Sequence, residues 1–256
     1  GDDHLTNAFR QTRIFNALSW DAPIYAHIPL IHGPDGAKLS KRHGALGVDA
    51  YRDMGYLPEA VLNYLCRLGW SHGDDEIFSM EQAVEWFDII DVNKGATRFD
   101  YDKLSSLNAK YIDVSDNERL IALALPGIEA TLGKPVSDTV RQRLSNGMDS
   151  LKLRADTIPQ LIELSMFYCL ERPLSYTDKA AKMFDDDARA RLAELRAPLA
   201  ELENWDQETV EAAVKAHVEA YGLKLGMIAQ PLRVALTGLN VSPGIFEVAA
   251  VLGQDE

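Results

Sequence analysis

The chain has 256 residues, of which 46% are hydrophobic and 25% charged, with a formal net charge of −13, and this composition predicts a soluble globular protein that can bury two or three small cores. No apolar run approaches the roughly 20 residues of a membrane span, and the opening GDDHLTNAFR lacks the basic and apolar regions of a signal peptide, so we expect a cytoplasmic protein without a membrane partner. Cys66 and Cys169 lie 103 positions apart in apolar segments, which excludes a disulfide framework or a Cys-x-x-Cys metal site.

The first 47 residues predict a small piece of α/β structure. Apolar residues in 5–18 recur at helical spacing and predict a helix that Trp20 and Pro23 close. The apolar stretch IYAHIPLI at 24–31 suits a strand, and Pro29 confines that strand to an edge or ends it. Four glycines between 33 and 47 then predict a loop whose backbone can approach a ligand closely.

From residue 48 onward the periodicity is helical. Pro58 is placed to open a helix at its first turn, and Gly69 ends it. The inward stripe predicted for this helix consists of Ala60, Val61, Tyr64, Leu65 and Leu68. Two capping boxes, Ser79 with Gln82 and Ser115 with Glu118, predict where two further helices begin.

The C-terminal part continues the helical pattern. Asp206 is predicted to cap a helix that Gly222 closes. The inward face predicted for it consists of Val210, Ala213, Val214, Val218 and Tyr221. Three consecutive aspartates at 185–187 would point in different directions on a helix, so we expect a solvated face or a helix start there and predict no metal site. The chain as a whole is predicted to be mainly α, with an α/β fragment followed by helical domains and junctions near 109–118 and 171–178.

The segment GPDGAKLSKRHG at 33–44 places Lys38, Lys41 and Arg42 in one loop of an acidic chain. Residues 1–50 hold five basic and five acidic residues, residues 51–112 six and eleven, and residues 113–256 fifteen and twenty-three. Three cations on a glycine-rich loop suit a polyphosphate, since a charge pair at about 4 Å is worth about 1 kcal/mol in water and about 4 kcal/mol at an effective dielectric of about 20. This pattern favours phosphoryl or nucleotidyl transfer.

A solvated surface turn is the alternative for the same loop. Lys and Arg beside Gly, Asp and Pro are ordinary in surface loops, and the spacing alone favours the turn. A P-loop is excluded because no Gly-Lys-Thr or Gly-Lys-Ser occurs in the chain.

The sequence KLSKR at 38–42 resembles the Lys-Met-Ser-Lys-Ser signature of class I aminoacyl-tRNA synthetases, in the variant typical of bacterial glutamyl-tRNA synthetases. The five-residue motif alone is a weak signal. Further blocks resemble that family, in its order, along nearly the whole chain: GDDHLTNAFRQ, AHIPLIHGPDGAKLSKRHGA, GYLPEAVLNYLCRLGWS, FDYDKLSSLNAKYI, and AQPLRVALTG followed by SPGIFEV.

The resemblance implies an ATP site in the first 50 residues. The phosphates of ATP, with Mg²⁺ bound to them, would be held by Lys38, Ser40, Lys41 and Arg42. Lys41 would be the first candidate for stabilising the transition state of amino-acid activation, with Lys38 beside it.

The same resemblance places the backbone near Leu30 and Ile31 against adenine and His4 beside the L-glutamate pocket. For His4, as for His27, His32 and His43, a polar group satisfied by its neighbours is the alternative.

The resemblance also implies the order of domains. Residues 1–50 would be the C-terminal part of a Rossmann-type class I catalytic domain, and residues 51–112 a helical stem-contact region. Residues 113–175 and 176–256 would form two subdomains of an all-helical anticodon-binding domain, which favours the glutamyl over the glutaminyl enzyme. The family's His-Ile-Gly-His-type signature, which lies upstream of these blocks, is absent from the chain.

Carried over by position, Arg154 in LKLRADTI matches an arginine that reads the last anticodon base, and Arg233 in AQPLR matches one that contacts the first. The backbone around Ser242, Pro243 and Gly244 would line the same pocket. A bidentate arginine contact discriminates by roughly 1–3 kcal/mol. The alternative for Arg154 is a salt bridge to Asp156 or Asp149, which would contribute little.

The function that the resemblance implies is that of a monomeric glutamate–tRNA ligase, which activates glutamate with ATP and transfers it to tRNA(Glu). We expect these residues alone to bind tRNA without aminoacylating it, because one phosphate-binding loop without its opposing wall cannot exclude water or orient the reactants. The alternative is a non-catalytic helical tRNA-binding module, and the coding sequence upstream of residue 1 would distinguish the two. The sequence does not decide whether glutamine tRNA is also charged.

Overall fold

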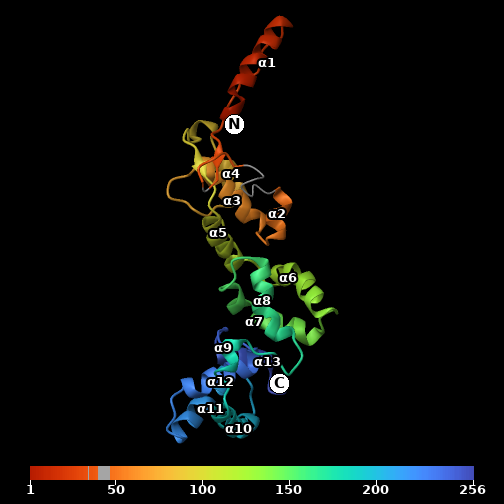
Figure 1. Cartoon of the computed structure of the whole chain (residues 1–256), viewed down its shortest axis with the longest axis vertical. Helices are drawn as coiled ribbons and strands as arrows, with labels where there is room; N and C mark the ends of the chain where they lie inside the picture. The colour runs from red at the N-terminus through yellow and green to blue at the C-terminus, as the bar shows by residue number, and fades with distance from the viewer. Residues whose placement is uncertain (34, 40–46) are drawn as a thin grey trace. The chain divides into compact units, whose positions relative to one another are not determined.

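The computed structural model describes residues 1–33, 35–39 and 47–256, and these residues are mostly helical (Figure 1). They divide into two compact units, Gly1–Tyr111 and Ile112–Glu256. The expectation of a mainly α fold is confirmed. The domain boundaries placed at residues 50, 112 and 175 stay predictions.

The first unit holds the few strand residues of the described chain. Its elements are a 3-10 helix (Asp2–His4), α1 (Leu5–Ala17), β1 (Ile31–His32), α2 (Val48–Asp53), α3 (Pro58–Gly69), α4 (Met80–Trp86), a second 3-10 helix (Ile89–Asp91), β2 (Thr97–Arg98) and α5 (Tyr101–Val114), the last crossing into the second unit. β1 and β2 pair in parallel, with Ile31 opposite Thr97 and His32 opposite Arg98.

The strand predicted over 24–31 is therefore wrong for all but its last residue. Pro29 cannot donate a ladder hydrogen bond, and β2, the partner of β1 among the described residues, is only two residues long. The helix predicted over 5–18 is confirmed as α1, although none of its residues is buried. Phe9 and Ile14 of its apolar stripe are 65% and 60% exposed.

α3 supplies much of the core of the first unit. Pro58 stands at its first turn, and Ala60, Tyr64 and Leu68 face inward as predicted. Leu65 was expected to be buried and is 43% exposed, because the packed face of α3 includes the position before Tyr64 and not the position after it. Asn63 lies inward instead, where its side-chain oxygen accepts hydrogen bonds from the Tyr111 hydroxyl at 2.8 Å and from the backbone nitrogen of Phe78 at 3.4 Å.

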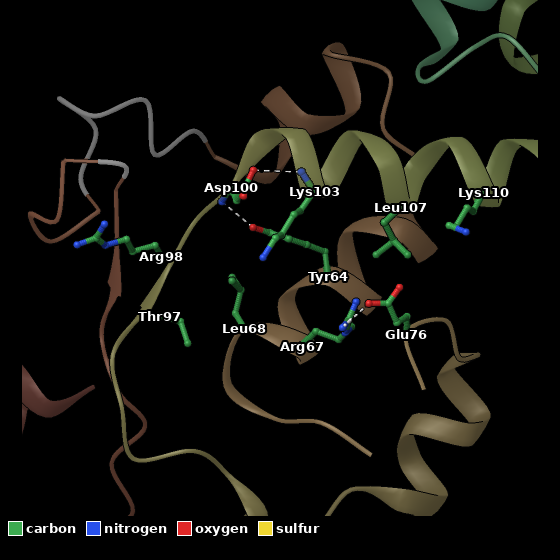
Figure 2. A pocket seen from close by; sticks show the side chains of 10 residues that line it. All are labelled: Tyr64, Arg67, Leu68, Glu76, Thr97, Arg98, Asp100, Lys103, Leu107 and Lys110. Carbon is green, nitrogen blue, oxygen red and sulfur yellow. Dashed lines mark hydrogen bonds and ion pairs between the residues drawn. The ribbon is translucent and has the colours of Figure 1, made fainter. Parts of the chain in front are cut away.

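Two apolar clusters stabilise the first unit. The larger one consists of Tyr56, Tyr64, Leu68, Phe99, Leu104 and Leu107, and the smaller one of Trp70, Phe78 and Ala83. α3 contacts β2 and α4, and it shares the larger cluster with Leu104 and Leu107 of α5 (Figure 2). Cys66 is half-buried beside the smaller cluster, and both cysteines are free thiols.

The second unit is built from two groups of helices. The elements are α6 (Asn117–Leu132), α7 (Asp138–Lys152), α8 (Ile158–Cys169), α9 (Asp178–Ala181), α10 (Asp186–Ala200), α11 (Gln207–Ala220), α12 (Gly226–Thr237) and α13 (Ile245–Leu252). α6, α7 and α8 contact one another, as do α10 with α11 and α12, and α13 with α11 and α12 (Figure 1). α13 also contacts α7, and α12 contacts α8.

The helix caps test the sequence patterns directly. The capping box of Ser79 with Gln82 is confirmed. The box of Ser115 with Glu118 is wrong, since α6 begins one residue later and Asp116 is its cap, accepting from the backbone nitrogen of Arg119 at 3.0 Å. Asp185 caps α10, as expected of a helix start.

Asp206 caps α11 as predicted. The inward face of this helix differs at its C-terminal end, where Tyr221 is 58% exposed and His217 is buried. His217 lies three and seven residues after Val214 and Val210, and this spacing keeps it on their face of the helix. No helix of the described residues is both long and apolar enough to cross a membrane.

Candidate functional site

The segment that carries the predicted ATP site folds back onto β1. The backbone nitrogen of Leu39 donates to the carbonyl of Ile31 at 2.9 Å, and Lys38 lies opposite His32 in an isolated antiparallel bridge. The turn between them contains Gly36 at φ +78°, a conformation that favours glycine. Ser40, Lys41 and Arg42, which complete the predicted site, lie outside the described residues.

Lys38 is engaged by a carboxylate. Its ammonium group donates to Asp3, and this hydrogen bond is the main cause that lowers the pKa of the Asp3 carboxyl below its usual value. His4 lies next to the same carboxylate, with its Nε2 at 3.9 Å from Asp3 Oδ2 and 64% of its side chain exposed. The structure thus brings His4, Lys38 and Ile31 to one place, and a phosphate bound by Lys38 would compete with Asp3.

The second group of predicted residues comes from helices that are distant in sequence. Arg154 follows the C-terminal end of α7 and is exposed, and Arg233 lies in α12 and is half-buried. Burial, and after it the positive charge of Arg154, lowers the pKa of Arg233. Two guanidinium groups that are 79 positions apart in the chain are therefore close enough in the fold to repel each other.

Arg233 also fixes the loop that leads into α13. Its Nη1 donates to the carbonyl oxygens of Ser242 at 3.1 Å and Pro243 at 2.8 Å, and to the Ser242 hydroxyl. The Ser242 hydroxyl in turn donates to the Pro243 carbonyl at 2.9 Å, and Gly244 is the N-cap of α13. Of the five residues predicted to contact an anticodon, four therefore lie together at this loop, and the charge of the fifth, Arg154, reaches Arg233.

The alternative for Arg154 is a salt bridge to Asp156 or Asp149, and of these two carboxylates Asp149 is already held by other groups. Asn117 donates to Asp149 at 2.9 Å and Lys152 pairs with it at 3.2 Å. These two contacts, the Asn117 hydrogen bond first, lower the pKa of the Asp149 carboxyl. Arg154 itself is exposed in the turn that follows α7.

Two residues near this loop are absent from the sequence prediction. Tyr168 in α8 is fully buried, and its hydroxyl has no hydrogen-bond partner among the described residues. Burial, and after it the negative charge of Glu247, raises the pKa of Tyr168. Glu247 lies three residues after the N-cap of α13, a spacing visible in the sequence, whereas nothing in the apolar α8 segment marks Tyr168.

This arrangement can hold an RNA base or a phosphate. A guanidinium group presents several N–H donors in one plane and can form two parallel hydrogen bonds to a base edge or a phosphate. Arg154 is exposed and can make such contacts, while the Nη1 of Arg233 is already hydrogen-bonded to the loop carbonyls. The described residues contain no group of three or more His, Cys, Asp or Glu placed to hold a metal ion.

Comparison with known proteins gives matches along the whole chain. Residues 1–106 match the family model of the class I tRNA synthetases (E and Q), catalytic domain, and residues 119–256 match that of the anticodon binding domain. The chain is 57% identical to glutamate–tRNA ligase 2 of Paramagnetospirillum magneticum and 53% identical to that of Rhodospirillum rubrum, with all of the chain covered.

The structure agrees with these matches. It resembles the crystal structure of a glutamate tRNA ligase from Elizabethkingia meningosepticum in complex with its amino acid, with a TM-score of 0.86 and 28% identity over 100% of this chain and 54% of that one. The chain spans about half the length of the curated relatives it matches, 54% and 55% of the two ligases above.

Proposed function

We propose that this chain, which belongs to the glutamyl-tRNA synthetase family of class I aminoacyl-tRNA synthetases, is part of a glutamate–tRNA ligase. That enzyme activates L-glutamate with ATP and transfers it to tRNA(Glu). The chain contributes the KLSKR segment of the active site and the helices that recognise the tRNA. It acts in the cytoplasm as a monomer.

The observation that carries this proposal is the pair Arg154 and Arg233 at the loop of Ser242, Pro243 and Gly244. Arg154 lies in the turn after α7 and Arg233 in α12, and both fall in the part of the chain that matches the anticodon binding domain model. Unpaired bases can be read by arginine forks on their Watson–Crick edges. Arg154 reads the last anticodon base, while Arg233 keeps the loop in place and contacts the first base with its remaining donors.

On the ATP side, Lys38, Ser40, Lys41 and Arg42 bind the phosphates. Mg²⁺ enters with ATP and is held by its phosphates. Lys38 exchanges the Asp3 carboxylate for a phosphate when ATP binds, and Lys41 stabilises the charge that develops on the departing pyrophosphate.

The remaining active-site contacts come from the residues beside that loop. The backbone at Leu30 and Ile31 lies against adenine, and His4 lies beside the bound glutamate.

The test is the substitution Arg154→Gln in the 256-residue chain. Dissociation constants are measured for transcripts of tRNA(Glu) and of a glutamine tRNA that differs at the last anticodon base. We expect the preference for tRNA(Glu) to fall about ten- to a hundredfold, the value of one bidentate arginine contact. Arg196→Gln, an exposed arginine of α10 in the same unit, is the matched control and should keep the preference. An unchanged preference in the Arg154 variant would contradict the assignment.

A second candidate function is a non-catalytic RNA-binding module, and the engagement of Lys38 by Asp3 favours it. The two functions differ in whether ATP reaches the loop. In the ligase that contains this chain, ATP should protect Lys38 from amine-labelling reagents, and neutralising Lys41 should abolish turnover. In the module ATP would leave the labelling of Lys38 unchanged. By itself, the chain is expected to bind RNA without supporting ATP–pyrophosphate exchange.

A further inference from the structure

The second unit contains two helix groups, and each group holds one arginine of the pair. The first helix group is α6, α7 and α8, and the second helix group is α10, α11, α12 and α13. Arg154 follows α7 of the first group, whereas Arg233 and the loop that it fixes belong to the second group. The position of one arginine relative to the other is therefore set by the contacts that join the two groups.

Four side-chain hydrogen bonds around Glu256 join the two helix groups. Arg143 of α7 donates from Nη1 to Glu256 Oε1 at 2.8 Å and from Nη2 to the carbonyl oxygen of Leu252 in α13 at 3.0 Å. Arg172, which follows α8, donates from Nε to Glu256 Oε2 at 2.8 Å and from Nη1 to the carbonyl oxygen of Leu236 in α12 at 2.8 Å. We refer to Glu256, Arg143 and Arg172 as the Glu256 cluster.

The Glu256 cluster is largely shielded from water. The side chains of Glu256, Arg143 and Arg172 are 19%, 15% and 24% exposed. Charge-assisted hydrogen bonds are short and geometrically specific, and they are stronger where water is excluded. The helices of the two groups also pack against each other, α7 on α13 and α8 on α12, but burial of apolar surface is non-directional. The hydrogen bonds of the cluster therefore fix the orientation of one group against the other.

The cluster lies close to Arg233 along its helix and far from Arg154 along its own. Leu236, which accepts from the cluster, is three residues after Arg233 in α12, about one turn away. Arg143 is eleven residues before Arg154, which is about 16 Å along the helix axis. A rotation of α7 by about 5° at the cluster would move Arg154 by about 1.4 Å. This displacement is large, since N–H···O hydrogen bonds form over a range of only about 0.5 Å.

We propose that Glu256, Arg143 and Arg172 are positioning residues for tRNA selection. They act by fixing the place of Arg154 relative to Arg233, and they do not contact the RNA themselves. The proposal rests on the proposed function, because that function assigns the two arginines to the anticodon. Without the Glu256 carboxylate, the two guanidinium groups of the cluster lose their shared acceptor and repel each other, which loosens the contact between the helix groups.

The test measures the preference of the 256-residue chain for a tRNA(Glu) transcript over a glutamine tRNA transcript that differs at the last anticodon base. The variant is Glu256→Gln, which keeps the shape of the side chain and removes its charge. We expect the preference to fall about tenfold, the lower end of the effect of losing one bidentate arginine contact, because Arg154 is displaced and not removed.

Asp116→Ala is the matched control. It removes the N-cap of α6, where Asp116 accepts from the backbone nitrogen of Arg119 within the first helix group. The variant therefore lowers stability while the Glu256 cluster stays intact, and it should keep the preference. Equal losses of preference in Asp116→Ala and Glu256→Gln would indicate a general effect of lower stability and would overturn the proposal.

Arg172→Gln tests the cluster from its other side. We expect this variant also to lose about tenfold in preference, and the double variant with Glu256→Gln to lose no more than the larger of the two single losses, because both changes break one cluster. An arginine that contacted a phosphate would lower the slope of log K against log salt by about 1, so an unchanged slope is expected for a positioning residue. A lower slope, or losses that multiply in the double variant, would contradict the proposal.

The outcomes separate this proposal from the proposed function. If the preference for tRNA(Glu) depends on Arg154, yet Glu256→Gln keeps it, only the positioning role of the cluster is refuted. If the unaltered chain binds both tRNAs equally, the assignment of Arg154 to the anticodon is refuted and the positioning role with it.

Discussion

The contact between α7 and α8 gives a prediction whose size can be worked out from the structure. Gly147 in α7 faces Tyr168 in α8, and a Cβ at position 147 would lie 2.6 Å from Cε2 and 2.9 Å from Cζ of that ring. Tyr168 is fully buried, so its ring has no free space to turn into. Gly127 in α6 offers a matched control, because a Cβ there would meet only the end of the Ile162 side chain, at 2.4 Å from Cδ1.

The two Gly→Ala substitutions gain the same helix propensity but differ in the steric cost of the added methyl group. Replacing a glycine by alanine inside a helix favours folding by about 0.8–1.0 kcal/mol. Overpacking a rigid core costs about 1–3 kcal/mol, whereas moving the flexible end of a half-buried Ile162 costs about 0.5–1.5 kcal/mol. Gly147→Ala is therefore expected to lower the free energy of unfolding by about 1 kcal/mol, and Gly127→Ala to leave it nearly unchanged.

The assay is urea denaturation followed by far-ultraviolet circular dichroism, with hydrogen exchange of peptides from α7 and α8 to locate the effect. The slope of free energy against urea should stay constant between the variants, so that midpoints report stability. A difference of 1 kcal/mol also corresponds to a shift of about 2–4 °C in Tm for a chain of roughly this size. Equal stabilities for Gly147→Ala and Gly127→Ala would refute the reasoning.

Two further predictions concern carboxylates that accept hydrogen bonds, Glu256 from two arginines and Asp116 at the start of α6. Glu256 accepts hydrogen bonds from Arg143 and Arg172, each at 2.8 Å, and although burial acts to raise its pKa, these bonds and charges lower it. Glu256→Gln should cost about 1–2 kcal/mol near neutral pH. The pKa of Glu256 is lower in the folded chain than in the unfolded chain, so its stabilising contribution is lost as pH falls through the folded pKa. The stability difference between Glu256→Gln and the unaltered chain should therefore shrink over that pH range. Urea titrations at several pH values measure this difference. Asp116→Ala removes the N-cap of α6 and should lower the free energy of unfolding by about 1 kcal/mol. Glu118→Ala, at the exposed position that the wrong capping box singled out, should lower it by less than about half of that. Equal losses in the two variants would contradict the assignment of Asp116 as the cap.

The arginine pair is a local exception to the acidity of the chain. The net charge of −13 repels RNA, and the fold offsets this where two cations from distant parts of the sequence meet, Arg154 and Arg233. A surface of this kind favours specific over indiscriminate binding, because an RNA that does not reach the pair meets mostly negative charge.

Local sequence patterns determined the helical class of this protein and several helix ends. Pro58, the Ser79 box and Asp206 were each identified from residues within four positions, and helix starts depend on interactions of that range. The Ser115 box met the same pattern and was wrong, because Asp116 beside it is an equally good cap and accepts from the backbone nitrogen of Arg119.

Only the tertiary structure decided which distant residues meet. The sequence alone contains no pattern that places Arg154 beside Arg233, and their shared role was expected only from resemblance to a family. Helix periodicity specifies which face of a helix is apolar, but the choice between Leu65 and Asn63, or Tyr221 and His217, depends on the surface packed against that face.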